Sequence, residues 1–343
     1  MDEKLNLIYK KQSTAIDILK LLFAYGVVAI HTQAAKKFPL YLQLWTAMAV
    51  PFFFICSGFF FQEKLNKSSP ETYRGGVKNY FKRLFRPFII WGLWYLMLDG
   101  LNRVLIDGDG LQMVLYQLGQ RLLVSSPGGG LWYIQAILSM LIILYIMNNR
   151  RHGMEAFTLI LVTFYVFNTI ISKCSTENEF MYYVKGHLFP KEYSALNFVF
   201  NGAFFLVGMV WSKYKDCKVA TIILEYRWII LGSTIFLWFV QSEFTPINTV
   251  LWAFGNILRI TTLFLCAMNL QIGIAPKVGA KMRSMSSRIY FLHFTVIYLM
   301  KICMRIIGIQ YDGMILFILS AMVLSIVSYI LDSQKLKWTK ALF

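Results

Sequence analysis

The chain has 343 residues, of which 57% are hydrophobic and only 15% are charged. This composition excludes an ordinary soluble domain of that length and predicts a multi-pass membrane protein. The net charge of +17 fits the surplus of Lys and Arg that membrane proteins carry at the cytoplasmic surface, where these residues also meet anionic lipid head groups. We therefore expect membrane lipids and no nucleic acid among its partners.

The apolar segments predict an all-α fold, a polytopic bundle of about ten transmembrane helices, because a bilayer of about 30 Å requires about 20 apolar residues per helix. Such segments fall at 13–33, 41–62, 82–99, 131–148, 154–172, 195–212, 227–243, 249–270, 288–304 and 313–331. Most of the 34 Lys and Arg residues fall in the connecting segments that this count places inside, so both termini are expected to be cytoplasmic. We expect a single membrane domain over 1–343 with tails at 1–12 and 332–343.

The first predicted helix carries Asp17, Lys20 and His31. An ionisable group in hydrocarbon costs roughly 2.5 to 3.5 kcal/mol, so such groups usually face a protein cavity and serve a function. Lys20 and His31 are about three helical turns apart and therefore share one face, about 16 Å from each other. His31 is the candidate general base because imidazole accepts a proton near pH 7. The structural alternatives are an interfacial His31 and a Lys20 that reaches the head groups or pairs with Asp17.

A dense cationic cluster opens the third predicted helix, formed by Lys78, Lys82, Arg83 and Arg86. Guanidinium and ammonium groups are well suited to phosphates. The cluster therefore predicts a cytoplasmic site for a nucleotide or a coenzyme. Ordinary positive-inside charge is the alternative explanation.

Four polar or flexible features lie in or beside other predicted helices. Ser57 interrupts an aromatic run and either donates a hydrogen bond into a cavity or permits close helix packing. Trp132 follows the glycine run 128–130, whose backbone amides suit an anion or an acyl oxygen, although Trp is also common at membrane interfaces. Arg259 lies too deep to reach the head groups and requires a partner, while His293 is assigned a structural hydrogen bond. The scattered cysteines lack metal-ligand spacing, so no metal is expected.

Together these segments resemble the integral-membrane acyltransferases of the type-three family, which includes bacterial polysaccharide O-acetyltransferases. The matching segments are 16–20 followed by His31, then 53–59, 82–87, 131–133 and 290–293. The resemblance extends over roughly residues 14 to 300, with Lys20 in place of the arginine that is more usual in the family.

The resemblance implies an O-acyltransferase of the bacterial inner membrane. It would transfer an acetyl group from cytoplasmic acetyl-CoA, its donor substrate, to a hydroxyl of an envelope glycan or a lipid-linked sugar. The implied catalytic residues are His31 as general base with Lys20, Asp17 and Ser57, and the implied donor-binding residues are Lys78, Lys82, Arg83, Arg86, Trp132 and Arg259. Self-association into a homo-oligomer is left open.

Two other classes of function fit the same residues. Buried Asp17, Lys20, Arg259 and His31 would also suit a proton-coupled or passive transporter of a small polar or amphiphilic solute. A membrane sensor or interaction subunit is the second alternative. Binding and turnover of a coenzyme A thioester would distinguish the enzyme from both.

Overall fold

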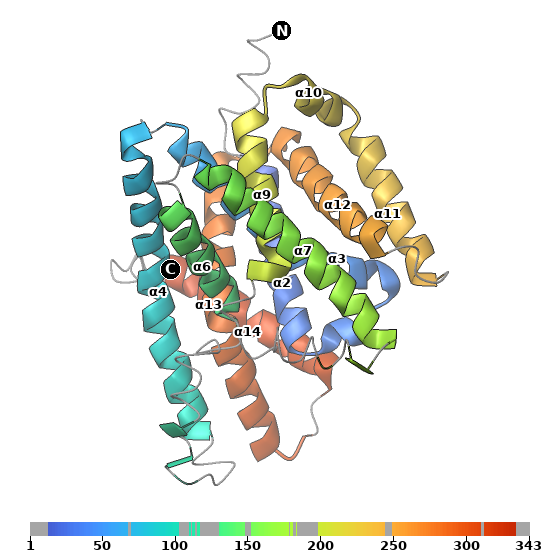
Figure 1. Ribbon diagram of the computed structural model, residues 1–343. Helices are drawn as coiled ribbons and strands as arrows, with labels where there is room; N and C mark the ends of the chain where they lie inside the picture. Colours follow the sequence, from blue (N-terminus) through green and yellow to red (C-terminus); the bar gives the residue numbers. More distant parts are fainter. Residues whose placement is uncertain are drawn as a thin grey trace.

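The fold is given by a computed structural model (Figure 1), in which all regular structure within the described residues is helical. The structure describes residues 13–67, 70–102, 110, 112–113, 115–116, 130–147, 152–177, 179–180, 183, 198–243, 249–309 and 312–333. The helices are α2 (Thr14–His31), η1 (Ala34–Lys37), α3 (Leu40–Leu65), α4 (Pro70–Asn102), α6 (Trp132–Met147), α7 (Gly153–Glu177), α9 (Phe198–Tyr214), α10 (Lys218–Glu225), α11 (Arg227–Glu243), α12 (Thr249–Asn269), α13 (Pro276–Ile306) and α14 (Gly313–Ser333). The predicted tail 1–12 and residues 334–343 of the other tail lie outside the described residues.

Each of the ten predicted segments coincides with a helix, which confirms the all-helical fold. Two helices extend well beyond their predicted starts: α4 begins at Pro70 rather than 82, and α13 begins at Pro276 rather than 288. Basic residues expected in connecting loops therefore lie on helices.

Five described helices are long and apolar enough to cross a membrane, and the bent pair α10 and α11 would make a sixth. Helix α6 has 16 residues and α9 has 17, and at 1.5 Å per residue both are shorter than a bilayer core of about 30 Å. These helices define a multi-pass membrane protein. The count of ten spans and the cytoplasmic termini stay predictions.

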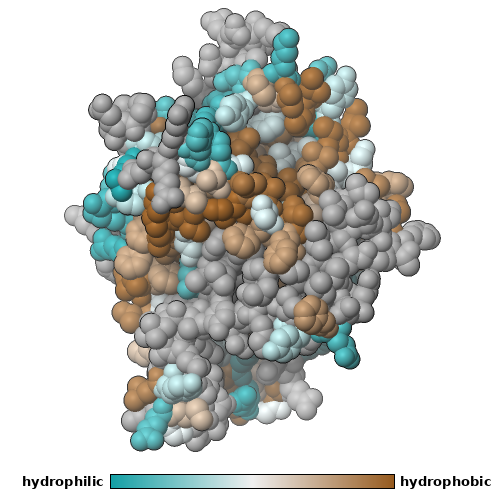
Figure 2. All heavy atoms as spheres, in the orientation of Figure 1, coloured by the Kyte–Doolittle hydropathy of each residue, from teal (hydrophilic) through white to brown (hydrophobic). Residues whose placement is uncertain are grey.

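Several helices present apolar side chains outward. Figure 2 shows hydrophobic side chains across the upper half of the visible face, with hydrophilic residues mainly along its upper left. Large apolar residues are exposed on α4, α11 and α14, including Leu93, Ile229, Phe236, Met322 and Ile326. An apolar surface of this extent is unusual for a soluble monomer and suits contact with lipid.

The centre of the bundle is the contact between α3 and α9, the most extensive between any two helices. Two glycines allow this approach: a Cβ at Gly58 would overlap the carbonyl oxygen of Phe205, and a Cβ at Gly208 would overlap that of Ile55. Small residues serve the same purpose in many membrane helix pairs. The fully buried rings of Phe59 and Phe205 fill the space around the contact.

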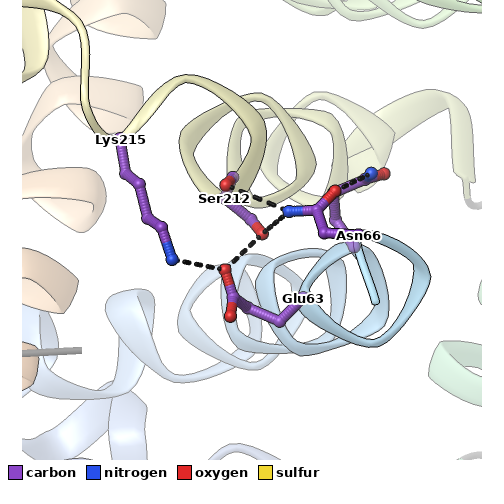
Figure 3. A network of polar contacts seen from close by, with 5 residues as sticks. Glu63, Asn66, Ser212 and Lys215 are labelled. Atoms are coloured by element: carbon purple, nitrogen blue, oxygen red, sulfur yellow. Dashed lines mark hydrogen bonds and ion pairs between the residues drawn. The ribbon is translucent and has the colours of Figure 1, made fainter. Parts of the chain in front are cut away.

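A polar network joins the C-terminal ends of α3 and α9 (Figure 3). Glu63 accepts hydrogen bonds from Ser212 and Lys215, both at 3.0 Å. Asn66 donates to the hydroxyl and to the carbonyl oxygen of Ser212, both at 3.3 Å. The carboxylate is thus paired with a cation and hydrogen-bonded where the two helices end.

Helix α13 packs against both α2 and α14. Arg283 binds Asp17, Ser286 donates to the backbone oxygen of Lys20, and further along the rings of His293 and His31 are in contact. Residue numbers therefore increase in the same direction along both helices. The parallel helices α2 and α13 therefore bring polar residues into contact at both ends of their interface.

Candidate active site

A cavity of about 930 Å³ opens between α2, α3, α4, α6 and α13. This volume is within the range of small-molecule and cofactor sites. Five cationic side chains line it, and no Asp or Glu is among its lining residues in the described part of the chain. These five cations are Lys20, Lys82, Arg83, Arg86 and Arg283. Such a concentration of one charge favours an anionic ligand.

Three of the cavity cations come from α4. Because α4 starts at Pro70, these residues lie on continuous helix. Arg86 is four residues after Lys82 and three after Arg83, so its side chain is next to both on the helix surface. The Arg83 guanidinium lies 4.7 Å from the centre of the Tyr80 ring. Lys78, which the sequence assigned to the same donor-binding group, is exposed and is not among the lining residues.

The two ionisable residues near the start of α2 have different surroundings. Lys20 lines the cavity, and its ammonium nitrogen lies 4.7 Å from the centre of the Phe60 ring. Asp17 is 4% exposed and does not line the cavity. It accepts two hydrogen bonds from Arg283, at 2.9 and 3.0 Å. The alternative that Asp17 pairs with Lys20 on the same helix face is therefore wrong, because the carboxylate is bound by an arginine from α13.

His31 is the last residue of α2 and lines the cavity. The centre of its ring lies 5.3 Å from that of His293 and 4.6 Å from that of Phe294. Within the described part of the chain, the imidazole of His31 forms no hydrogen bond. Both its ring nitrogens are therefore available to a substrate.

His293 is 1% exposed and forms the structural hydrogen bond expected of it, from Nδ1 to the backbone oxygen of Tyr290 at 2.6 Å. A carbonyl oxygen only accepts, so we assign the hydrogen to Nδ1, which makes Nε2 the unprotonated nitrogen of the neutral ring. Among the described residues Nε2 has no hydrogen-bond partner. Tyr290 also donates to the backbone oxygen of Gly130 at 2.6 Å, so His293 is held by a segment that is itself fixed.

Ser57 lines the cavity and pairs with Tyr133, with 2.6 Å between the two hydroxyl oxygens. Tyr133 also donates to the backbone oxygen of Phe53 at 3.1 Å. When Tyr133 donates there, Ser57 must be the donor to Tyr133, because each hydroxyl has one hydrogen. The oxygen lone pairs of Ser57 then remain for a ligand. Trp132 lines the same cavity beside Tyr133.

Arg259 lies apart from the cavity lining. It is 4% exposed on α12, donates to the backbone oxygen of Thr234 at 3.1 Å, and bonds the side-chain oxygen of Asn256. These contacts bind the two terminal nitrogens of the guanidinium, while Nε has no hydrogen-bond partner among the described residues. The structure therefore does not bring Arg259 together with the other residues assigned to the donor.

Three cavity residues were given no role by the sequence analysis. Arg283 was counted only among the inner positive charges, although the buried Asp17 needed a cationic partner and so gave an indirect signal. Tyr133 and Tyr290 lie in the segments 131–133 and 290–293 that carry the family resemblance, but neither was assigned a role, because tyrosine is abundant in this chain, with 19 residues. Their place in the cavity follows from tertiary packing alone.

The fold and the cavity together define a class: a multi-pass membrane protein with an internal cationic cavity that also contains a histidine without a hydrogen-bond partner among the described residues. The family model for the acyltransferase domain matches residues 13–332. The chain therefore belongs to the acyltransferase type-three family, a family of membrane acyltransferases. Comparisons with curated proteins and with solved structures found no significant match.

Proposed function

We propose that this protein is an O-acetyltransferase of the bacterial inner membrane that uses cytoplasmic acetyl-CoA as donor. The acceptor is a hydroxyl of a cell-envelope glycan or of a lipid-linked sugar. The observation that carries the proposal is the cavity, which combines five cationic side chains with the ring of His31. Membership of the family supports acyl transfer, and the cations support a donor that carries several phosphate groups.

The positions of Lys20 and His31 on α2 suggest how the donor lies. About three helical turns, or roughly 16 Å, separate the two residues along the helix axis. The donor phosphates would lie near Lys20 and the cations of α4, with the thioester toward His31 and the pantetheine arm between them. Lys20 is then too far from His31 to act on the reacting carbonyl, so we assign it to the phosphates.

His31 has the chemistry required of a general base. Its neutral imidazole would take the proton of the acceptor hydroxyl while the hydroxyl oxygen attacks the thioester carbonyl carbon. The carbon–sulfur bond then breaks, and the leaving thiolate takes the proton from the imidazolium. Rotation of the Ser57 or the Tyr133 hydroxyl would supply a hydrogen bond to the transient oxyanion.

Turnover by the purified protein tests this proposal. Release of free thiol from acetyl-CoA is followed with and without an envelope glycan extract, for the parent, His31→Ala and the control His152→Ala. His152 is an exposed histidine outside the cavity. We expect His31→Ala to lower extract-dependent release by about 10²- to 10⁴-fold, the usual contribution of a general base. The control is expected to match the parent.

Coenzyme binding distinguishes a variant that has lost catalysis from one that has failed to fold. Coenzyme A should raise the melting temperature of the parent and of His31→Ala alike, because its phosphates contact the other end of the cavity. If a folded His31→Ala protein turns over within a few fold of the parent, His31 is not the base. If the parent neither releases thiol nor responds to coenzyme A, the transferase proposal is wrong and solute uptake into proteoliposomes becomes the relevant assay.

A further inference from the structure

The ion pair between Asp17 and Arg283 lies where α2 and α13 meet beside the cavity. Arg283 donates from Nε to one carboxylate oxygen at 2.9 Å and from Nη2 to the other at 3.0 Å. The side chain of Asp17 is 5% exposed, whereas that of Arg283 is 35% exposed and lines the cavity. The pair is thus buried on its acidic side and open on its basic side.

A guanidinium group has five N–H donors in a rigid plane. Asp17 accepts two of them, and within the described part of the chain the Arg283 side chain has no other partner. Three N–H groups therefore remain for a ligand. The two-bonded contact with Asp17 also fixes the plane of the guanidinium, so a ligand need not order this flexible side chain on binding.

Neighbouring contacts hold this part of α13 in place. Ser286, three residues after Arg283, donates to the backbone oxygen of Lys20 at 2.9 Å. Lys20 is three residues after Asp17, so the two contacts lie about one turn apart on each helix. Lys20 and Arg283 both line the cavity. The contact between α2 and α13 therefore adds two cations to the cavity that the three cations of α4 also line.

We propose that Arg283 binds a phosphate group of the acyl donor and that Asp17 is the residue that positions it. Arg283 acts from α13 while Lys82, Arg83 and Arg86 act from α4, so donor phosphates are bound from two helices. The inference rests on the proposed function and extends it. An arginine that binds a donor phosphate makes the enzyme select a phosphorylated donor over a bare pantetheine thioester. The rival explanation is an ion pair that only ties α2 to α13.

Donors that differ in phosphate content distinguish the two explanations. Steady-state kinetics are measured with acetyl-CoA and with S-acetylpantetheine, which has no phosphate. The variants are Arg283→Gln, Arg283→Lys and Asp17→Asn. Lys277→Gln is the matched control, because Lys277 is an exposed cation on α13 that does not line the cavity.

We expect Arg283→Gln to raise KM for acetyl-CoA by about 10- to 100-fold, which is the range for a hydrogen bond to a charged group. The kcat for acetyl-CoA should stay within a few fold of the parent, and kinetics with S-acetylpantetheine should be nearly unchanged. Arg283→Lys should recover part of the loss. Asp17→Asn should shift KM in the same direction by a smaller factor, while Lys277→Gln should behave like the parent.

Equal losses with both donors would overturn the inference and leave the pair as a tie between helices. If Arg283→Gln does not fold, Arg283→Lys, which keeps the charge, provides the same donor comparison. Failure of the inference is distinct from failure of the proposed function. In the first case the parent still turns over acetyl-CoA, and in the second it does not.

Discussion

A substitution at Gly130 would disturb the part of the cavity near His31 without changing any ionisable group. A Cβ at this position would lie 2.8 Å from Cε1 of His293 and 2.8 Å from Cδ2 of Phe294. Both rings contact His31. The backbone of Gly130 cannot easily retreat, because its carbonyl oxygen accepts a hydrogen bond from Tyr290.

The required displacement can be worked from these distances. Ordinary contact begins at 3.4 Å, so the neighbouring rings must move by about 0.6 Å in Gly130→Ala. Overpacking of this kind costs about 1 to 3 kcal/mol of stability. A shift of about 1 Å in reacting groups lowers rates about 10²-fold, and we therefore expect acetyl transfer to fall by roughly 10- to 100-fold. Acetyl-CoA turnover and the melting temperature in detergent are the measurements.

Gly232→Ala is the matched control. A Cβ at Gly232 on α11 meets nothing within 4 Å, and alanine is favoured over glycine in a helix by about 1 kcal/mol. This variant should be at least as stable as the parent and equally active. Full activity of Gly130→Ala would refute the argument that these rings set the position of His31. A loss of activity that only follows a loss of folded protein would refute it as well.

Two further predictions concern stability. The hydrogen bond from Lys37 lowers the pKa of the exposed Asp312, so its stabilising effect is present above the ordinary Asp pKa and is lost as pH falls through the lowered value. The melting temperature of Asp312→Asn should accordingly lie below that of the parent at neutral pH and converge with it below about pH 4; a constant difference would contradict this. Gly208→Leu should prevent close packing against Ile55 and reduce the yield of folded, monodisperse protein. The control Gly232→Leu should not reduce the yield. Equal yields for the two variants would contradict the account of the α3–α9 contact.

The helical fold was predictable because hydrophobic segments of membrane length are a strong local signal. The ends of two helices were not predictable. The basic residues before position 82 and before position 288 lower local hydropathy, which is typical of a loop. In the structure these residues continue α4 and α13, since a helix that leaves the apolar layer still satisfies its own backbone hydrogen bonds.

The candidate site was predictable where one helix carries the signal. Spacing along α2 placed Lys20 and His31 on one face, and both line the cavity. Pairings between helices were not predictable: Asp17 and Arg283 are separated by 266 positions, and nothing local distinguishes Arg283 from its basic neighbours. Arg259 shows the opposite case: its depth in a predicted helix drew attention to it, but in the structure it lies outside the cavity lining and binds oxygens of Thr234 and Asn256.

The cations of α4 show why positive-inside charge and ligand binding are compatible explanations. A charge that only orients a helix in the membrane must lie near its end, but it need not line a ligand cavity. On α4, Lys82, Arg83 and Arg86 line the cavity, while Lys78, about one turn earlier, does not. Lys78 and Lys82 are four residues apart and share a helix face, so the position of each side chain along the helix, relative to the cavity, separates the two roles. Replacement of Lys78 should leave donor KM unchanged and replacement of Arg86 should raise it, although either change removes one positive charge from α4.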